Sequence, residues 1–166
     1  MSMEYRIEEM AAFRVVGLAI STTNENGEGM QKLPEFWGNV IQNNKQMDIV
    51  GLMNKPPFGL LGVNVYNTDP KNPQKFDYYI ACSSDQPLPE GMKEYTVPEA
   101  TWAVFPCKRD KIGETEVRVV MEWQKTAEYE LLNTGYETGD MVSSAPDIEV
   151  YGQGDDVEVW VAVRKK

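Results

Sequence analysis

The stretch of residues 156–163, "DVEVWVAV", limits the fold more than any other part of the chain. Every odd position from 157 to 163 is valine, and Glu158, Trp160 and Ala162 alternate with the valines. This period of two, in β-branched and aromatic residues, predicts a strand. One face of the strand is aliphatic, and the other carries a carboxylate two residues from an indole. The chain therefore needs a sheet with one face suited to a packed layer and a second face that accommodates Glu158 and Trp160.

Similar patterns divide the rest of the chain into strands and helices. Apolar residues at helical spacing predict a helix over residues 30–41. The segment 114–132 fits either period, and its length favours a helix. Strands are predicted at residues 13–20, 58–67, 76–85, 95–107 and 146–152. The order strand, helix, hairpin occurs twice, which predicts an α+β domain with a largely antiparallel sheet.

The length of 166 residues suits a single domain. We expect one domain over residues 1–166 with two pseudo-repeats, roughly 1–88 and 89–166, that share element order and no visible sequence repeat. No apolar run approaches the ~20 residues of a membrane span, and no secretory signal is visible. The expectation is a soluble cytoplasmic protein without a membrane partner.

Charge and composition exclude several classes of function. The chain has 16 basic and 26 acidic residues and a net charge of −10, which argues against direct nucleic-acid binding and is compatible with cationic partners. It has no histidine, so histidine-dependent triads and histidine metal sites are excluded. Cys82 and Cys107 form no metal motif and no disulfide framework. We expect no metal and no cofactor, and any chemistry falls to carboxylates, Tyr or Lys.

The pairing of Glu158 with Trp160 has two interpretations. On an exposed strand, both are ordinary surface residues. In a cavity, an ionised acid and surrounding rings hold a cation, or an acid whose pKa is raised by burial transfers protons. Small residues beside aromatic ones favour a cavity lining, as at Tyr79 and Ala81, and Asn64 lies on a face with Gly62 and Tyr66.

Seven segments, taken in order, resemble a known family. They are "FRVVGLAIS" (13–21), "LPEFWGNV" (33–40), "YYIACSSD" (78–85), "YTVPEATWAVF" (95–105), "LLNTGYE" (131–137), "PDIEVYG" (146–152) and "VEVWVAVRKK" (157–166). The chain resembles the effector-binding domain of AraC- and MerR-type multidrug regulators, which also occurs alone in gyrase-inhibitor-like proteins. The likeness covers nearly the whole chain, and its last two segments are the most specific part.

The resemblance implies two β-α-β-β repeats that form one curved antiparallel sheet, with a helix in each half and a central ligand cleft. Family members bind lipophilic, often cationic compounds, and a pocket glutamate on the last strand corresponds here to Glu158. The resemblance implies that Trp160 and Tyr79 are pocket walls. Tyr136, Trp102 and Trp37 are further candidates. Core packing is the preferred alternative for Trp37, and the sequence does not settle the facing of Trp102.

The sequence departs from the family in two places, and we expect no DNA-binding helix-turn-helix before the first strand. Ala162 stands where the family often has Pro, and Glu130 precedes Leu131 and Leu132 where the family commonly has a Trp just before this stretch. Ala162 alters the family pattern of the last strand. The loss of the Trp would reshape one wall of the cleft, or Glu130 would place a second carboxylate there.

Three functions follow from the resemblance. The favoured one is a binding module for lipophilic, cationic, drug-like compounds, which acts in sensing or sequestration and is not an enzyme. The alternative is a hydrolase of reactive cyclopropane-type toxins, in which Glu158 activates water and Tyr79 assists. The third is a protein-interaction module, with a DNA-binding regulator or gyrase as the candidate partner.

Overall fold

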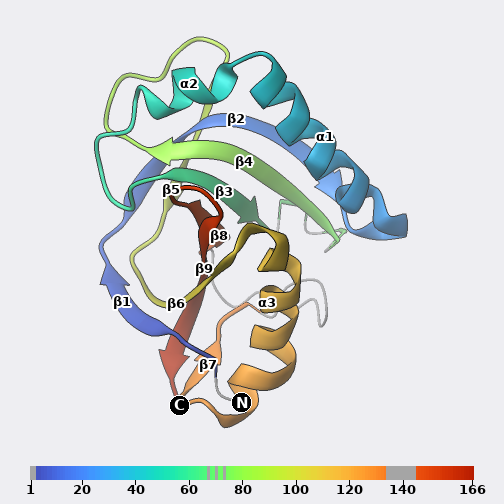
Figure 1. The fold of residues 1–166 in the computed structure, drawn as a ribbon, viewed down its shortest axis with the longest axis vertical. Helices are drawn as coiled ribbons and strands as arrows, with labels where there is room; N and C mark the ends of the chain where they lie inside the picture. Colours follow the sequence, from blue (N-terminus) through green and yellow to red (C-terminus); the bar gives the residue numbers. More distant parts are fainter. Residues whose placement is uncertain (1–2, 67, 70, 73, 134–144) are drawn as a thin grey trace.

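One antiparallel sheet of nine strands runs through the computed structural model, which describes residues 3–66, 68–69, 71–72, 74–133 and 145–166 (Figure 1). The strands are β1 Arg6–Met10, β2 Phe13–Thr23, β3 Leu60–Val65, β4 Lys75–Ser83, β5 Lys93–Val97, β6 Ala100–Lys108, β7 Tyr129–Leu131, β8 Asp147–Tyr151 and β9 Asp156–Lys165. The six strands predicted from the sequence are confirmed, except that the segment 95–107 is interrupted after Val97 and contributes to both β5 and β6.

The strand order shows two equivalent halves. Along the sheet the strands follow β1-β6-β9-β8-β3-β4-β2-β5, and β7 pairs with β9. Strands β2, β3 and β4 with the first helix form one β-α-β-β unit, and β6, β8 and β9 with the later helix form the other. The two units join where β3 pairs with β8. The predicted α+β fold of two such repeats is confirmed.

Each half also receives an edge strand from the other part of the chain. Strand β1 pairs with β6 of the second unit, and β5 pairs with β2 of the first unit. Sequence patterns did not predict β1. These exchanged strands bind the two halves together through backbone hydrogen bonds on both sides of the central junction.

The helices are α1 Glu28–Gln42, α2 Lys45–Val50, α3 Ile112–Arg118 and α4 Gln124–Thr126, with short 3-10 turns at Glu25–Gly27 (η1) and Arg109–Lys111 (η2). The predicted helix over residues 30–41 is confirmed, and α2 was not predicted. Between α3 and α4 the chain makes a π-helical turn, η3 Val119–Trp123. The ambiguous segment is therefore mainly helical and ends in β7.

The π-helical turn changes which residues of this helix are buried. Val117 and Met121 fit both the helical and the strand spacing of this segment, and these side chains are 44% and 49% exposed. The buried residues are Thr115, Val119 and Trp123, which follow one another at intervals of four. A π turn has more residues per turn than an α-helix, so a spacing of four keeps residues on one face.

The curved sheet has a filled inner face and a helix-covered outer face. The inner face forms one core that contains residues of both halves, among them Leu61, Tyr79, Trp102 and Trp160. On the outer face, α1 and α2 cover β2 and β4, and α3 covers β6 and β9 (Figure 1). The valine row of β9 packs under α3, as the sequence predicted. Among the described residues, no helix has the length and apolar character needed to cross a membrane.

Candidate ligand-binding cleft

The outer face of the two central strands carries the candidate site. Paired residues of antiparallel strands point to the same face. Gly62 pairs with Glu149, and Asn64 pairs with Asp147, so these four residues form a patch across β3 and β8. The patch lies between the region covered by α1 and α2 and the region covered by α3.

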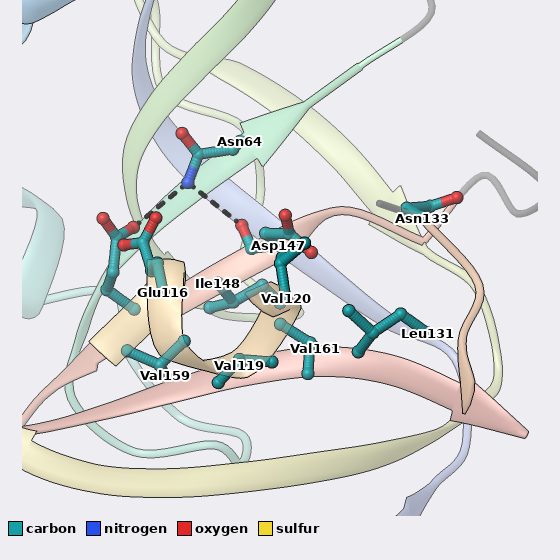
Figure 2. Close-up of a pocket in the computed structure, with 11 residues that line it drawn as sticks. Asn64, Glu116, Val119, Val120, Leu131, Asn133, Asp147, Ile148, Val159 and Val161 are labelled. Atoms are coloured by element: carbon teal, nitrogen blue, oxygen red, sulfur yellow. Dashed lines mark hydrogen bonds between the residues drawn. The ribbon is translucent and has the colours of Figure 1, made fainter. Parts of the chain in front are cut away.

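A small cavity of about 30 Å³ opens at this patch beneath α3. Its lining residues are Asn64, Glu116, Val119, Val120, Leu131, Asn133, Asp147, Ile148, Glu149, Val159 and Val161. In Figure 2 the carboxylates of Glu116 and Asp147 lie at the end of the cavity near Asn64, whereas Leu131 and the valines line the rest. This volume suffices for about one water molecule.

Three carboxyl groups meet at the polar end of the cavity. The Asn64 amide nitrogen donates hydrogen bonds to Glu149 Oε2 and to the Asp147 carbonyl, each over 3.2 Å. Burial, reinforced by the charge of Glu116, raises the pKa of Glu149 well above its ordinary value. Burial also raises the pKa of Glu116 to about 8 and that of Asp147 to about 7. The cleft therefore concentrates acids whose ionised forms are poorly solvated.

These acids lack a cationic counterpart. Among the described residues, no Lys or Arg forms an ion pair with Glu116, Asp147 or Glu149. The described Asp, Glu and Cys residues also form no group of three that could hold a metal ion. The site therefore gathers acids that have no neutralising cation among the described residues.

Aromatic groups border the acids on the α1 side. The Trp37 indole nitrogen donates to the Tyr78 hydroxyl over 2.9 Å, and the Tyr78 and Tyr151 hydroxyls share a hydrogen bond. The Trp37 and Tyr151 rings meet edge to face, with centroids 5.0 Å apart. Burial, followed by the charge of Glu149, raises the pKa values of both tyrosines, so both hydroxyls stay protonated.

Gly62 makes room for the Tyr78 hydroxyl and the Glu149 carboxylate to lie close together. A β-carbon at this position would lie 2.3 Å from the Tyr78 hydroxyl oxygen and 2.8 Å from Glu149 Oε2. Real β-carbons do not approach other heavy atoms so closely. Glycine therefore lets a phenol and a carboxylate lie together over β3.

A larger groove adjoins this aromatic wall. It has a volume of about 370 Å³ and is lined by Trp37, Ile41, Gln46, Leu60, Arg109 and Tyr151. Tyr151 follows Glu149 by two residues on β8, so both side chains lie on the outer face. The groove and the acid cluster are thus neighbouring parts of one cleft.

Glu158 lies on the opposite face of the sheet from Glu149, and its surroundings differ from the predicted cavity. Arg6 forms a bidentate ion pair with it, with distances of 2.6 Å from Nη1 to Oε2 and 3.1 Å from Nη2 to Oε1. The Trp160 indole nitrogen donates to Glu158 Oε1 over 3.1 Å. Burial acts to raise the pKa of Glu158, but the hydrogen bonds from Arg6 and Trp160 lower it below its ordinary value. The acid and the indole are neighbours, as expected, but the acid is already neutralised.

The expectation of a hollow on the Trp160 face is wrong because the protein fills that face with its own core. Trp160 is 4% exposed and packs against Trp102, with ring centroids 5.9 Å apart. Trp102 is fully buried in the same core, which settles its facing. Tyr79 is also buried there, beside Tyr95.

Two other predicted residues do border the cleft. Asn64 lines its cavity, and Trp37 of α1 lines its groove and also packs against the core beneath that helix. Tyr136 lies outside the described residues. The predicted set is thus split between the two faces of the sheet, and whether any member binds a ligand stays a prediction.

Sequence reasoning missed Glu149, although the signal was present. Glu149, Val150 and Tyr151 repeat the pattern acid, valine, aromatic that drew attention to Glu158. In the β8–β9 hairpin, Glu149 pairs with Val159, whereas Val150 pairs with Glu158. The two acids therefore point to opposite faces, and Glu149 shares its face with the valines under α3.

Comparison with known proteins identifies the family. The model of the Cass2 integron-associated effector binding protein matches residues 6–163, which is nearly the whole chain. The chain belongs to this family. No protein of curated function matches the sequence.

Three solved structures have the same fold. The structure of SAV2435 bound to tetraphenylphosphonium is 22% identical, with a TM-score of 0.74 over 98% of this chain and 94% of that one. A bacterial transcription regulation protein from Staphylococcus aureus is 21% identical, with a TM-score of 0.73 and coverage of 98% and 99%. The integron cassette protein of Vibrio cholerae is 20% identical, with a TM-score of 0.62 and coverage of 96% and 95%.

Proposed function

We propose that this effector-binding protein binds lipophilic organic cations in the cleft between α1 and α3 and acts in their sensing or sequestration. The observation that carries the proposal is the group of partly buried carboxyls at Glu149, Glu116 and Asp147, which has no cationic partner among the described residues. A buried carboxylate without a counter-charge is costly. A bound cation would relieve this cost, and neighbouring rings would add cation–π attraction.

Ligand size assigns different roles to the two parts of the cleft. The cavity of about 30 Å³ is too small for a drug-like molecule, whereas the groove of about 370 Å³ falls within the usual range for ligand sites. The body of the ligand would lie in the groove against Trp37 and Tyr151, with its positive charge directed towards Glu149. The related fold of SAV2435, solved with tetraphenylphosphonium, supports this ligand class.

The test compares two acids of the same sheet. We expect Glu149→Gln to weaken tetraphenylphosphonium binding at least tenfold in a calorimetric titration at pH 8, and to change binding of neutral triphenylphosphine oxide less than twofold. The matched control, Glu158→Gln, removes an acid that Arg6 already neutralises and should leave both affinities unchanged. Equal cation affinity in wild type and Glu149→Gln would refute the proposal, and a loss confined to Glu158→Gln would return the site to the inner face.

A hydrolytic role is a second candidate, favoured by one observation. Burial raises the pKa of Glu149 well above its ordinary value, and the carboxyl lies beside the hydroxyl of Tyr78, so its protonated form could donate a proton to a bound electrophile. Glu158 and Tyr79, the pair predicted from the sequence, line neither part of this cleft. Mass spectrometry of a reactive cyclopropane compound incubated with wild type and Glu149→Gln separates turnover from binding.

A partner protein would convert binding into a response. EcmrR, solved in complex with DNA, has a domain of this fold, and the present chain covers 58% of that EcmrR chain with a TM-score of 0.51. This likeness supports a DNA-binding regulator as the partner. The AraC-type and gyrase-inhibitor-like assignments remain further proposals, and so does gyrase as a partner. A pull-down with gyrase at low and high salt would test the partner.

A further inference from the structure

The groove contains a positive charge that the proposed function does not use. Arg109 begins η2 and lines the groove together with Trp37 and Tyr151. Its guanidinium carbon lies 5.7 Å from the centroid of the Tyr151 ring. A plain lipophilic cation that binds against Tyr151 therefore meets a like charge on the same ring.

Backbone contacts fix this arginine in place. Its amide nitrogen donates to the Asp155 carbonyl over 2.8 Å, and its Nη2 donates to the Gly154 carbonyl over 3.1 Å. Both acceptors belong to the turn between β8 and β9. The guanidinium group is thus held at the mouth of the groove by the same hairpin that carries Glu149.

Arg109 also differs from the other arginines of the chain. The chain has five arginines, and four of them, Arg6, Arg14, Arg118 and Arg164, form ion pairs with glutamates. Arg109 forms no ion pair with any described carboxylate. A guanidinium group has five N–H donors, and the protein contacts described here use one side of it, so a planar acceptor can still bind.

The two ends of the cleft therefore have opposite polarity. Glu149 and its neighbouring acids lie at one end, Arg109 lies at the mouth, and Trp37, Ile41 and Leu60 provide apolar surface along the groove. The side-chain oxygen of Gln46, which also borders the groove, has no hydrogen-bond partner in the described structure. A ligand with a cationic centre and a remote carboxylate would match both charges.

Resting on the proposed cation site, we propose that Arg109 selects for amphiphilic zwitterions, that is, aromatic cations that carry a carboxylate or similar acceptor at their far end. A carboxylate would form a charge-assisted hydrogen bond with the guanidinium group. A cation without this group would gain nothing at the mouth of the groove and would be repelled there.

The test uses two fluorescent probes that share one cationic ring system. Rhodamine B has a free carboxylate, and rhodamine B ethyl ester has that carboxylate blocked. We expect wild type to bind rhodamine B more tightly than the ester, as measured by fluorescence anisotropy at pH 8. In Arg109→Met the ratio of the two affinities should fall about three- to tenfold, because the zwitterion loses its partner and the ester loses a repulsion.

Two controls separate this selectivity from general charge effects and from the cation site. Lys108→Met removes the neighbouring positive charge, which pairs with Asp156 over 2.6 Å, and should leave the ratio unchanged. Glu149→Gln should weaken both probes alike, because both carry the same cation. Urea unfolding of Arg109→Met checks that the exposed substitution leaves the fold intact.

The outcomes distinguish the two proposals. If neither probe binds wild type, the proposed function fails and the selectivity fails with it. If both probes bind, Glu149→Gln weakens both and Arg109→Met leaves their ratio unchanged, the cation site stands and the role of Arg109 is refuted. An equal loss for both probes in Arg109→Met would likewise refute selection by charge and make the arginine a wall of the groove.

Discussion

A rise in pH from 5 to 9 should destabilise the folded protein, because the cleft raises the pKa values of its acids. Burial raises the pKa of Asp147 from 3.8 to about 7 and that of Glu116 from 4.5 to about 8. In the unfolded chain these groups lose their protons near their ordinary values. Between about pH 4 and pH 8 the folded state therefore binds more protons, so the free energy of unfolding falls as the pH rises.

The magnitude follows from the size of these differences. A pKa difference of about three corresponds to about 4 kcal/mol for one isolated group. Neither side chain is completely buried, and solvent penetration and local relaxation reduce the cost of charge. We therefore expect a total loss of about 3 kcal/mol between pH 5 and pH 9.

Urea unfolding at pH 5, 7 and 9 measures this loss directly. Asp147→Asn and Glu149→Gln should each flatten the dependence and raise the free energy of unfolding at pH 9, since each removes one of the crowded charges. Glu158→Gln is the control: the folded-state pKa of Glu158 is lowered, so its stabilising effect is complete above its ordinary pKa and is constant over this range. A free energy of unfolding that stays constant or rises from pH 5 to pH 9 would refute this account of the cleft.

Three further substitutions probe separate features of the structure. Gly62→Ala places a methyl group against the Tyr78 hydroxyl and the Glu149 carboxylate. It should lower the free energy of unfolding in urea by about 1–3 kcal/mol and weaken tetraphenylphosphonium binding. An unchanged free energy of unfolding together with an unchanged affinity would contradict the close approach. Trp160→Ala removes a large side chain from the inner core and should cost about 3–5 kcal/mol, whereas a cost below about 1 kcal/mol would show that this face is not tightly packed. Arg6→Ala breaks a partly exposed ion pair and should cost at most about 1 kcal/mol without changing cation affinity, so a large affinity change would restore Glu158 as a binding residue.

The sequence predicted the fold well because period and order are local properties. Alternation identified β9, and helical spacing identified α1, before any contact was known. Strand β1 escaped notice because "RIEEM" has two adjacent glutamates and little apolar alternation. The buried face of the segment 114–132 was not predicted, because its apolar residues fit both periods and a π turn changes the number of residues per turn.

Which of the two acids faces the proposed cleft could not be predicted from the sequence, because it depends on strand register. Glu149 and Glu158 each precede an aromatic residue by two positions on a strand, so their local patterns are equivalent. Only the pairing of Glu149 with Val159 places the first acid on the helix-covered face. The neutralisation of Glu158 depends on Arg6, which lies 152 residues away along the chain and reaches it through β1.

The exchanged edge strands have a consequence for how a bound effector can be reported. A cut between residues 88 and 89 would leave the N-terminal fragment without β5, the partner of β2, and the C-terminal fragment without β1, the partner of β6. Neither fragment has a complete set of neighbours, so we expect each to refold only with its complement. Because each half holds an edge strand from the other, we expect the two halves not to separate where β3 pairs with β8. If the proposed cleft binds an effector, we expect the helices α1 and α3 to shift over a sheet that stays whole.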